Sequence, residues 1–206
     1  MKANSPNKVA IIMGSKNDYS IMSQCEQILK KFKIKNDVLI VSAHRTPERL
    51  FKFAKNAHKN YSVICAGAGR AAHLAGMCAS LTKIPVIGIP IKDKKTDGVS
   101  ALFSVAEMPN GIPVATTAIN GALNAGLLAI SIIALQDKKV RKQLESYRVR
   151  QTKSVKKKTK INVKIYSFRS NWWRSTRLAF MHSCKKIKSE NSCSIRRQRW
   201  ASTKIL

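Results

Sequence analysis

The chain has 206 residues, 44% of them hydrophobic, which suffices for one ordinary domain and an appendage. Its net charge of +29 is uneven: residues 1–137 hold 17 Lys and Arg against 8 Asp and Glu, whereas residues 138–206 hold 22 against 2. The sequence has no apolar run near the ~18 residues of a membrane helix and no signal-peptide core, so we expect a cytoplasmic protein rather than a membrane or secreted one.

Short runs rich in β-branched residues predict five strands along the first part of the chain. Polar and apolar residues do not alternate within them, which is typical of parallel strands buried on both faces of a sheet. The runs are residues 9–13, 37–43, 62–66, 85–91 and 114–119.

Helical patterns separate these runs. Apolar residues recur at steps of three and four from Tyr19 to Phe32, and Pro47 suits the first turn of a second helix. Two further segments are rich in Ala and Gly, as tightly packed helices are. They are residues 71–81 and 121–136. Repeated strand–helix units predict a three-layer αβα, flavodoxin-like domain with a parallel sheet of about five strands.

The C-terminal part of the chain follows a different pattern. Residues 138–151 predict a charged helix on the surface or on a neighbouring subunit, and periodicity ends there. We therefore divide the chain into a domain of residues 1–151 and a basic tail of residues 152–206, which we expect to be disordered.

Two other interpretations of the tail stay open. Its charge is suited to RNA or DNA, but its aromatic residues, among them adjacent Trp172 and Trp173, are not spaced as base-stacking platforms, so nucleic acid is not the favoured partner. Alternatively, residues from about 161 onward are an out-of-frame translation. Tryptophan has the single codon TGG. Read one base later, the codons of Trp172 and Trp173 both give Gly, so the other reading frame would encode a glycine-rich loop of a second protein.

The five cysteines show no CxxC or metal-pair spacing. Cys25, Cys65 and Cys78 fall in apolar stretches, where a reduced cysteine acts as a small hydrophobic side chain. This usage fits a reducing compartment and predicts no metal site.

Polar and small residues follow three of the predicted strands. They read GSKND from Gly14, SAHRTP from Ser42, and AGAGRAAH from Ala66. Ligands of open parallel sheets bind outside the carboxyl ends of the strands, and small residues that lead into a helix can hold a phosphate. The three loops together predict a site for a phosphorylated small molecule.

The same loops resemble the 5-(carboxyamino)imidazole ribonucleotide mutase family. The motifs are GSKND, SAHRTPE, AGAG with AAHL and GM, and MPNGIPV, and the resemblance extends over residues 8–151. It implies an isomerase of de novo purine (IMP) biosynthesis that moves CO2 from a nitrogen to a ring carbon of an imidazole ribonucleotide. It also implies a homo-octamer that needs neither metal nor cofactor.

The resemblance assigns roles to individual residues. His44 matches the catalytic histidine, and Ser15, Asp18 and Arg45 match substrate-binding positions. Chemistry agrees, because one group must deliver a proton to the nitrogen and later remove one from the ring, and histidine does both near neutral pH. Residues 66–69 are the expected wall of a small dry pocket for CO2. The other expected substrate-binding residues are Ser42, Ala43, Gly69, His73 and Leu74.

Four residues depart from the family pattern. The family favours Gly in place of Arg70 and of Ala115, Pro in place of Ala75, and Asp in place of Ser100. Arg70 matters most, because it places a long cation in a loop that approaches the substrate. We expect it to crowd the pocket, the alternative being a phosphate contact. Competing functions are a direct carboxylase of aminoimidazole ribonucleotide, a nucleic-acid-binding protein that acts through the tail, and an inactive remnant.

Overall fold

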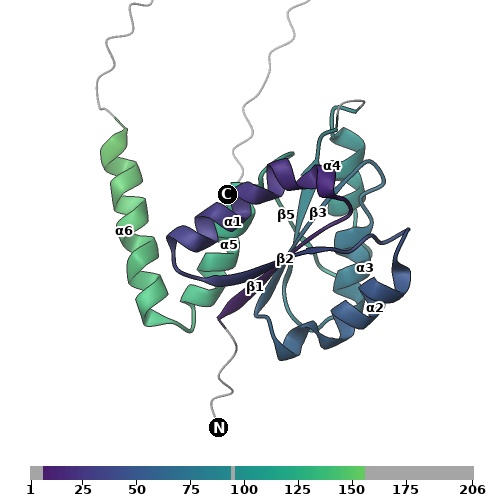
Figure 1. The fold of residues 1–206 in the computed structure, drawn as a ribbon. Helices are drawn as coiled ribbons and strands as arrows, with labels where there is room; N and C mark the ends of the chain where they lie inside the picture. Colours follow the sequence, from purple (N-terminus) through teal and green to yellow (C-terminus); the bar gives the residue numbers. More distant parts are fainter. Residues whose placement is uncertain (1–6, 94–95, 156–206) are drawn as a thin grey trace, which may run out of the picture. The chain divides into compact units, whose positions relative to one another are not determined.

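A parallel sheet of five strands forms the centre of the fold (Figure 1). The computed structural model describes residues 7–93 and 96–155. The strand order β2-β1-β3-β4-β5 is that of flavodoxin-like domains, which confirms the predicted class. The strands are β1 (Lys8–Met13), β2 (Lys35–Ile40), β3 (Val63–Gly69), β4 (Val86–Ile91) and β5 (Ala115–Thr116).

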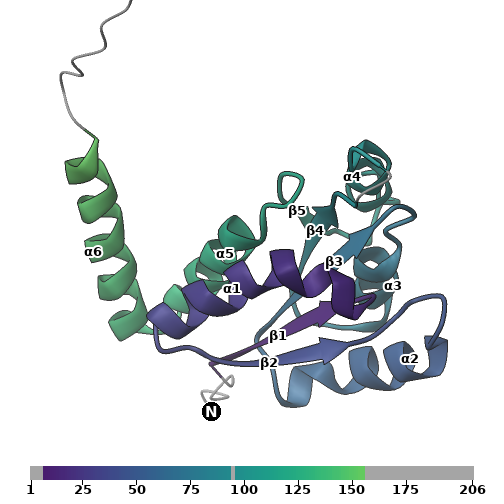
Figure 2. The same ribbon diagram turned by 45° about the horizontal axis from the view of Figure 1, so that its top comes forward.

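Helices cover both faces of the sheet, which completes the three predicted layers (Figure 2). One hydrophobic core lies under α1 and α5, and the other lies under α2, α3 and α4. The helices are α1 (Tyr19–Lys31), α2 (Pro47–Asn56), α3 (Leu74–Leu81), α4 (Val99–Ala106), α5 (Ala122–Ala134) and α6 (Lys138–Ser154), with short 3-10 turns η1 (Lys16–Asp18) and η2 (Ala57–Lys59).

Burial on both faces, expected for all five strands, holds for the inner ones. Every residue of β4 is buried, and β1 is buried after Lys8. The expectation is wrong for β2, whose residues are all at least partly exposed, because this edge strand pairs with β1 alone. The fifth strand is also shorter than residues 114–119. Only Ala115 and Thr116 pair with β4, after which the left-handed backbone of Asn120 turns the chain towards α5.

Helix α4 was not expected from the sequence. It follows Gly98, whose φ of 88° favours glycine, and the carboxylate of Asp97 accepts the backbone N–H of Val99. Only Ala101 and Val105 of this helix are buried. Apolar residues of this helix do recur at helical spacing, at Val99, Leu102, Phe103 and Ala106, so the sequence held a usable signal.

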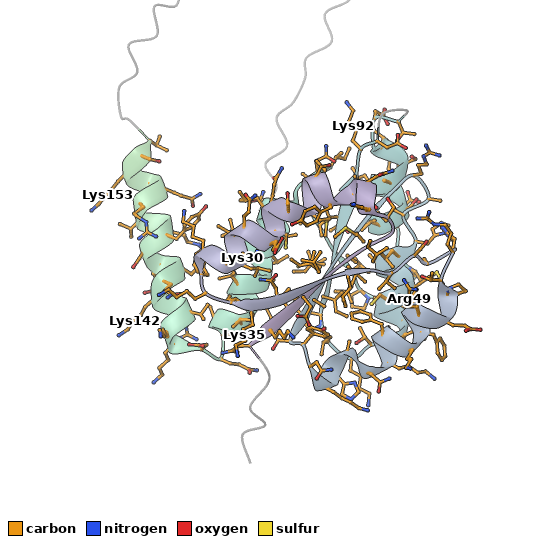
Figure 3. The ribbon with its side chains drawn as sticks, in the orientation of Figure 1. Lys30, Lys35, Arg49, Lys92, Lys142 and Lys153 are labelled. Atoms are coloured by element: carbon orange, nitrogen blue, oxygen red, sulfur yellow. The ribbon has the colours of Figure 1, made fainter. Side chains whose placement is uncertain are left out.

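Helix α6 lies on the surface and extends three residues beyond the predicted end. Asp137 caps it by accepting the backbone N–H groups of Lys139 and Val140. Val140 and Leu144 are buried with the residues of α1 and α5. Lys142 and Lys153 point away from the sheet (Figure 3). The helix thus belongs to the domain, while residues 156–206, and with them the interpretations of the tail, lie outside the described part of the chain.

The three described cysteines behave as small hydrophobic residues, as expected. Cys25, Cys65 and Cys78 are buried and not in disulfides, and burial raises the pKa of Cys78 to about 12. Within residues 7–93 and 96–155, no helix is long and apolar enough to span a bilayer.

Candidate functional site

A cavity of about 500 Å³ opens at the carboxyl ends of β1 and β3. In flavodoxin-like sheets the strand order reverses at β1 and β3, and ligands bind there. The loops after four strands line the cavity, and the lining includes every predicted site residue except His73. Its volume suits a small-molecule ligand.

The loop after β1 holds Ser15 and Asp18 in fixed positions. Ser15 accepts the backbone N–H of Asn17 through its Oγ, and Asp18 Oδ2 accepts both the backbone N–H and the hydroxyl of Ser15, at 2.9 and 3.3 Å. Burial raises the pKa of Asp18 above its usual 3.8, and the hydrogen bonds from Ser15 and the charge of Arg45 oppose that rise. The carboxylate is therefore oriented before any ligand arrives.

The loop after β2 positions Arg45. Thr46 Oγ1 accepts the backbone N–H of Ser42 at 3.0 Å and donates to the carbonyl of the same residue, which closes a tight turn. Ser42 is itself buried. Arg45 donates from Nε to Ser42 Oγ at 3.3 Å and from Nη2 to the carbonyl of Gly14 at 2.6 Å. The guanidinium thus joins the loops after β1 and β2.

His44 contacts a second histidine. Its Nε2 lies 2.9 Å from His73 Nδ1, and the two rings meet edge to face at 83°. One of these two nitrogens must carry the proton that they share. His73 lies at the start of α3 and is not among the residues that line the cavity, but it contacts His44, which is. Its substrate-binding role stays a prediction.

Only half of the predicted CO2 wall faces the cavity. Ala68 and Gly69 line it, whereas Ala66 and Gly67 lie inside the sheet. Gly69 is needed for close approach, since a Cβ there would lie 3.0 Å from the carbonyl oxygen of Ile91.

An ion pair joins the loops after β3 and β4. Arg70 adopts a left-handed backbone with φ of 57°, and its Nε donates to Asp93 Oδ2 at 2.6 Å. Both residues line the cavity. Sequence reasoning missed Asp93, although its position just after the end of β4 was a usable signal.

The AIR carboxylase family model matches residues 8–154. The chain belongs to the AIR carboxylase family. Among its relatives are the N5-carboxyaminoimidazole ribonucleotide mutases of Thermotoga maritima, 49% identical over 73% of this chain and 89% of the relative, and of Escherichia coli K12, 48% identical over 74% and 92%. A crystal structure of PurE from Treponema denticola matches with a TM-score of 0.65 and 30% identity, over 71% of this chain and 92% of that one.

Of the four departures from the pattern of this family, Arg70 alone belongs to the cavity lining. Ala75 is a buried residue of α3, Ser100 is exposed on α4, and Ala115 is exposed in β5. Three of the departures thus lie away from the chemistry, and the fourth is held by Asp93.

The described residues hold no group of three or more His, Cys, Asp or Glu side chains arranged to bind a metal ion.

Proposed function

We propose that this protein is an isomerase of de novo purine biosynthesis. It converts 5-carboxyamino-imidazole ribonucleotide into 4-carboxy-5-aminoimidazole ribonucleotide by moving CO2 from a nitrogen to a ring carbon. The observation that carries the proposal is the convergence of His44, Asp18 and Arg45 on one cavity of a chain that matches the family over residues 8–154.

Substrate binding uses the groups that the loops hold in place. Arg45 has N–H donors beyond the two bound to Ser42 and Gly14, and these bind the phosphate. Asp18 accepts hydrogen bonds from the ribose hydroxyls. The remaining contacts with the substrate come from five further residues that line the cavity, Ser15, Ser42, Ala43, Gly69 and Leu74.

His44 carries the proton. Its protonated ring donates to the exocyclic nitrogen as the nitrogen–carbon bond breaks, which releases CO2 and leaves a neutral amine and a neutral imidazole. Ring carbon C4 then forms its bond to CO2, and His44 removes the C4 proton, so aromaticity returns and the histidine is again protonated. His73, 2.9 Å away, holds the His44 ring in position for both steps.

The CO2 must stay beside C4 between these steps. Ala68 and Gly69 form a wall without polar side chains, so water finds no side-chain hydrogen-bond partner on that side of the cavity. The two steps balance without an added reactant, because His44 gives one proton to the nitrogen and takes one proton from C4.

The mutase reaction is favoured over direct carboxylation by the names of the relatives at 49% and 48% identity. Nucleic-acid binding has no support at the site, since it rests on residues 152–206, nearly all outside the described range. The mutase domain comprises residues 1–151. It acts in the cytoplasm as a homo-octamer. The exposed Leu123 and Leu128 of α5, with Leu135 just after it, offer apolar contacts between copies.

An isotope experiment tests the proposal on the full chain. The substrate is supplied with a 13C-labelled carboxyamino group in unlabelled, low-CO2 buffer, and the product is followed by NMR. A mutase places the label on C4 without added bicarbonate. Product formed only from aminoimidazole ribonucleotide and added CO2 would instead show a carboxylase, and no product from either substrate would show an inactive chain.

A further inference from the structure

The ion pair between Arg70 and Asp93 has no part in the proton chemistry, yet it lies at the cavity. We propose that Arg70 is an additional binding residue for an oxyanion of the substrate, phosphate or carboxylate, and that Asp93 positions it. This role rests on the function proposed above.

The backbone brings the pair together. Arg70 directly follows β3, and Asp93 lies two residues beyond β4; Lys92, labelled in Figure 3, marks that strand end. Because Gly69 has no side chain, the two strand ends approach closely. The left-handed conformation of Arg70 then directs the chain towards α3.

Asp93 is fixed from its other side. Its Oδ1 accepts the backbone N–H of Thr96 at 2.7 Å and the hydroxyl of the same residue at 3.1 Å. This turn leaves Oδ2 to receive Arg70 Nε at 2.6 Å. A carboxylate held by two donors is a rigid anchor for a flexible arginine.

Arg70 keeps binding capacity for a ligand. A guanidinium has five N–H donors, and the hydrogen bond recorded for Arg70 among the described residues uses Nε alone. Its side chain is 61% exposed. Arg70 borders both the 500 Å³ cavity and a neighbouring cavity of about 700 Å³. The outer edge of the guanidinium therefore faces the space in which an oxyanion would lie.

Charge balance gives the pair a second effect. Asp18 and Asp93 both line the cavity, and the pKa of Asp18 is raised first by burial and further by the charge of Asp93. Two carboxylates repel an anionic substrate, and Arg70 offsets one of them. Removal of Arg70 thus takes away an attraction for the anionic substrate at this edge of the cavity.

A double-mutant cycle on the full chain tests this inference. Arg70→Asn removes the charge, and asparagine tolerates the left-handed backbone. We expect KM to rise about 10-fold with kcat within ~2-fold, the scale of one charge-assisted hydrogen bond. Asp93→Asn should raise KM by less. The double variant should have the same KM as Arg70→Asn, because Asp93 acts on the substrate through Arg70. Arg49→Asn, on exposed α2 and outside the cavity, is the matched control.

Binding without turnover separates this inference from the proposed function. Calorimetry with ribose 5-phosphate and with imidazole-4-carboxylate needs no catalysis. Loss of affinity for either probe in Arg70→Asn supports the inference and names the oxyanion. Unchanged affinity for both, with unchanged KM, would overturn it even if the wild type is an active mutase. Should Arg70→Asn lower the melting temperature, Arg70→Gly, which suits the same φ, replaces it.

Discussion

Cations gather in two places, at the carboxyl edge of the sheet and on α6, and their surroundings differ. At the edge, Arg45 is bound to the loops after β1 and β2, and Arg70 is bound to Asp93. Helix α6 has seven Lys and Arg against one Glu. A groove of about 670 Å³ between α6 and the end of α1 has no carboxylate and no imidazole in its lining, which includes Lys31, Lys138, Lys139, Lys142 and Arg150.

The difference teaches that charge density does not locate the chemistry in this molecule. A lysine that projects into solvent is hydrated and flexible, so it gains little by meeting an anion there. The arginines at the sheet edge are preorganised by acceptors on neighbouring loops, so their remaining donors point in fixed directions. Helix α6 instead contributes packing, because Val140 and Leu144 share a hydrophobic core with α1 and α5. Within that core α1 and α5 meet closely at Gly126. We call α1, α5 and α6 the helix side of the molecule.

The largest expected effect is at the sheet edge. His44→Asn should lower kcat by at least ~100-fold, the usual scale for loss of a general acid–base group, with the melting temperature unchanged because His44 is exposed. Steady-state kinetics measure it, and His58→Asn, on exposed η2, is the control. Near-normal turnover in His44→Asn would remove the proton carrier from the mechanism.

The helix side should respond in stability alone. A Cβ at Gly126 would lie 2.3 Å from Ile28 Cγ2, so Gly126→Ala should lower the free energy of unfolding by about 1–3 kcal/mol through overpacking. Urea denaturation measures this, with Asn124→Ala on the exposed face of α5 as the control. A kcat that fell with the stability, at temperatures where the variant is folded, would break the separation between the two regions.

Asp18 connects activity to pH. Asp18→Asn should raise KM about 10-fold, because a charged acceptor for the ribose is lost. Burial raises the pKa of Asp18 above 3.8, so wild-type KM should begin to rise on acidification at a higher pH than for an ordinary aspartate. The raised pKa also means that folding favours protonated Asp18. The contribution of Asp18 to the free energy of unfolding is therefore full below pH 3.8 and is lost as the pH rises through its raised pKa. A pH profile of KM that is identical in Asp18→Asn would contradict this assignment.

The smallest effect is expected on α6. A variant with Lys138, Lys139 and Lys142 all changed to Gln should keep kcat and KM within ~2-fold, because these side chains lie in the groove away from the cavity. Gln has nearly the helix propensity of Lys, so the helix should persist. Circular dichroism and the isotope assay check both points. A 10-fold loss of activity with an intact helix would bring α6 into the chemistry.

Much of this molecule is encoded in local sequence. Buried apolar runs reveal β1, β3 and β4 because both faces of an inner parallel strand are covered. Pro47 marks the start of α2 because proline suits the first helical turn. The end of a strand marks the loop of His44 and Arg45 as a place for a ligand, whereas their individual roles come from the family resemblance.

The tertiary structure decided what depends on neighbours distant in sequence. The exposure of β2 follows from its place at the sheet edge. The contacts of His44 with His73 and of Arg70 with Asp93 join residues 29 and 23 positions apart. Such pairs form because the strand order places separate loops side by side, and no local pattern of residues records that order.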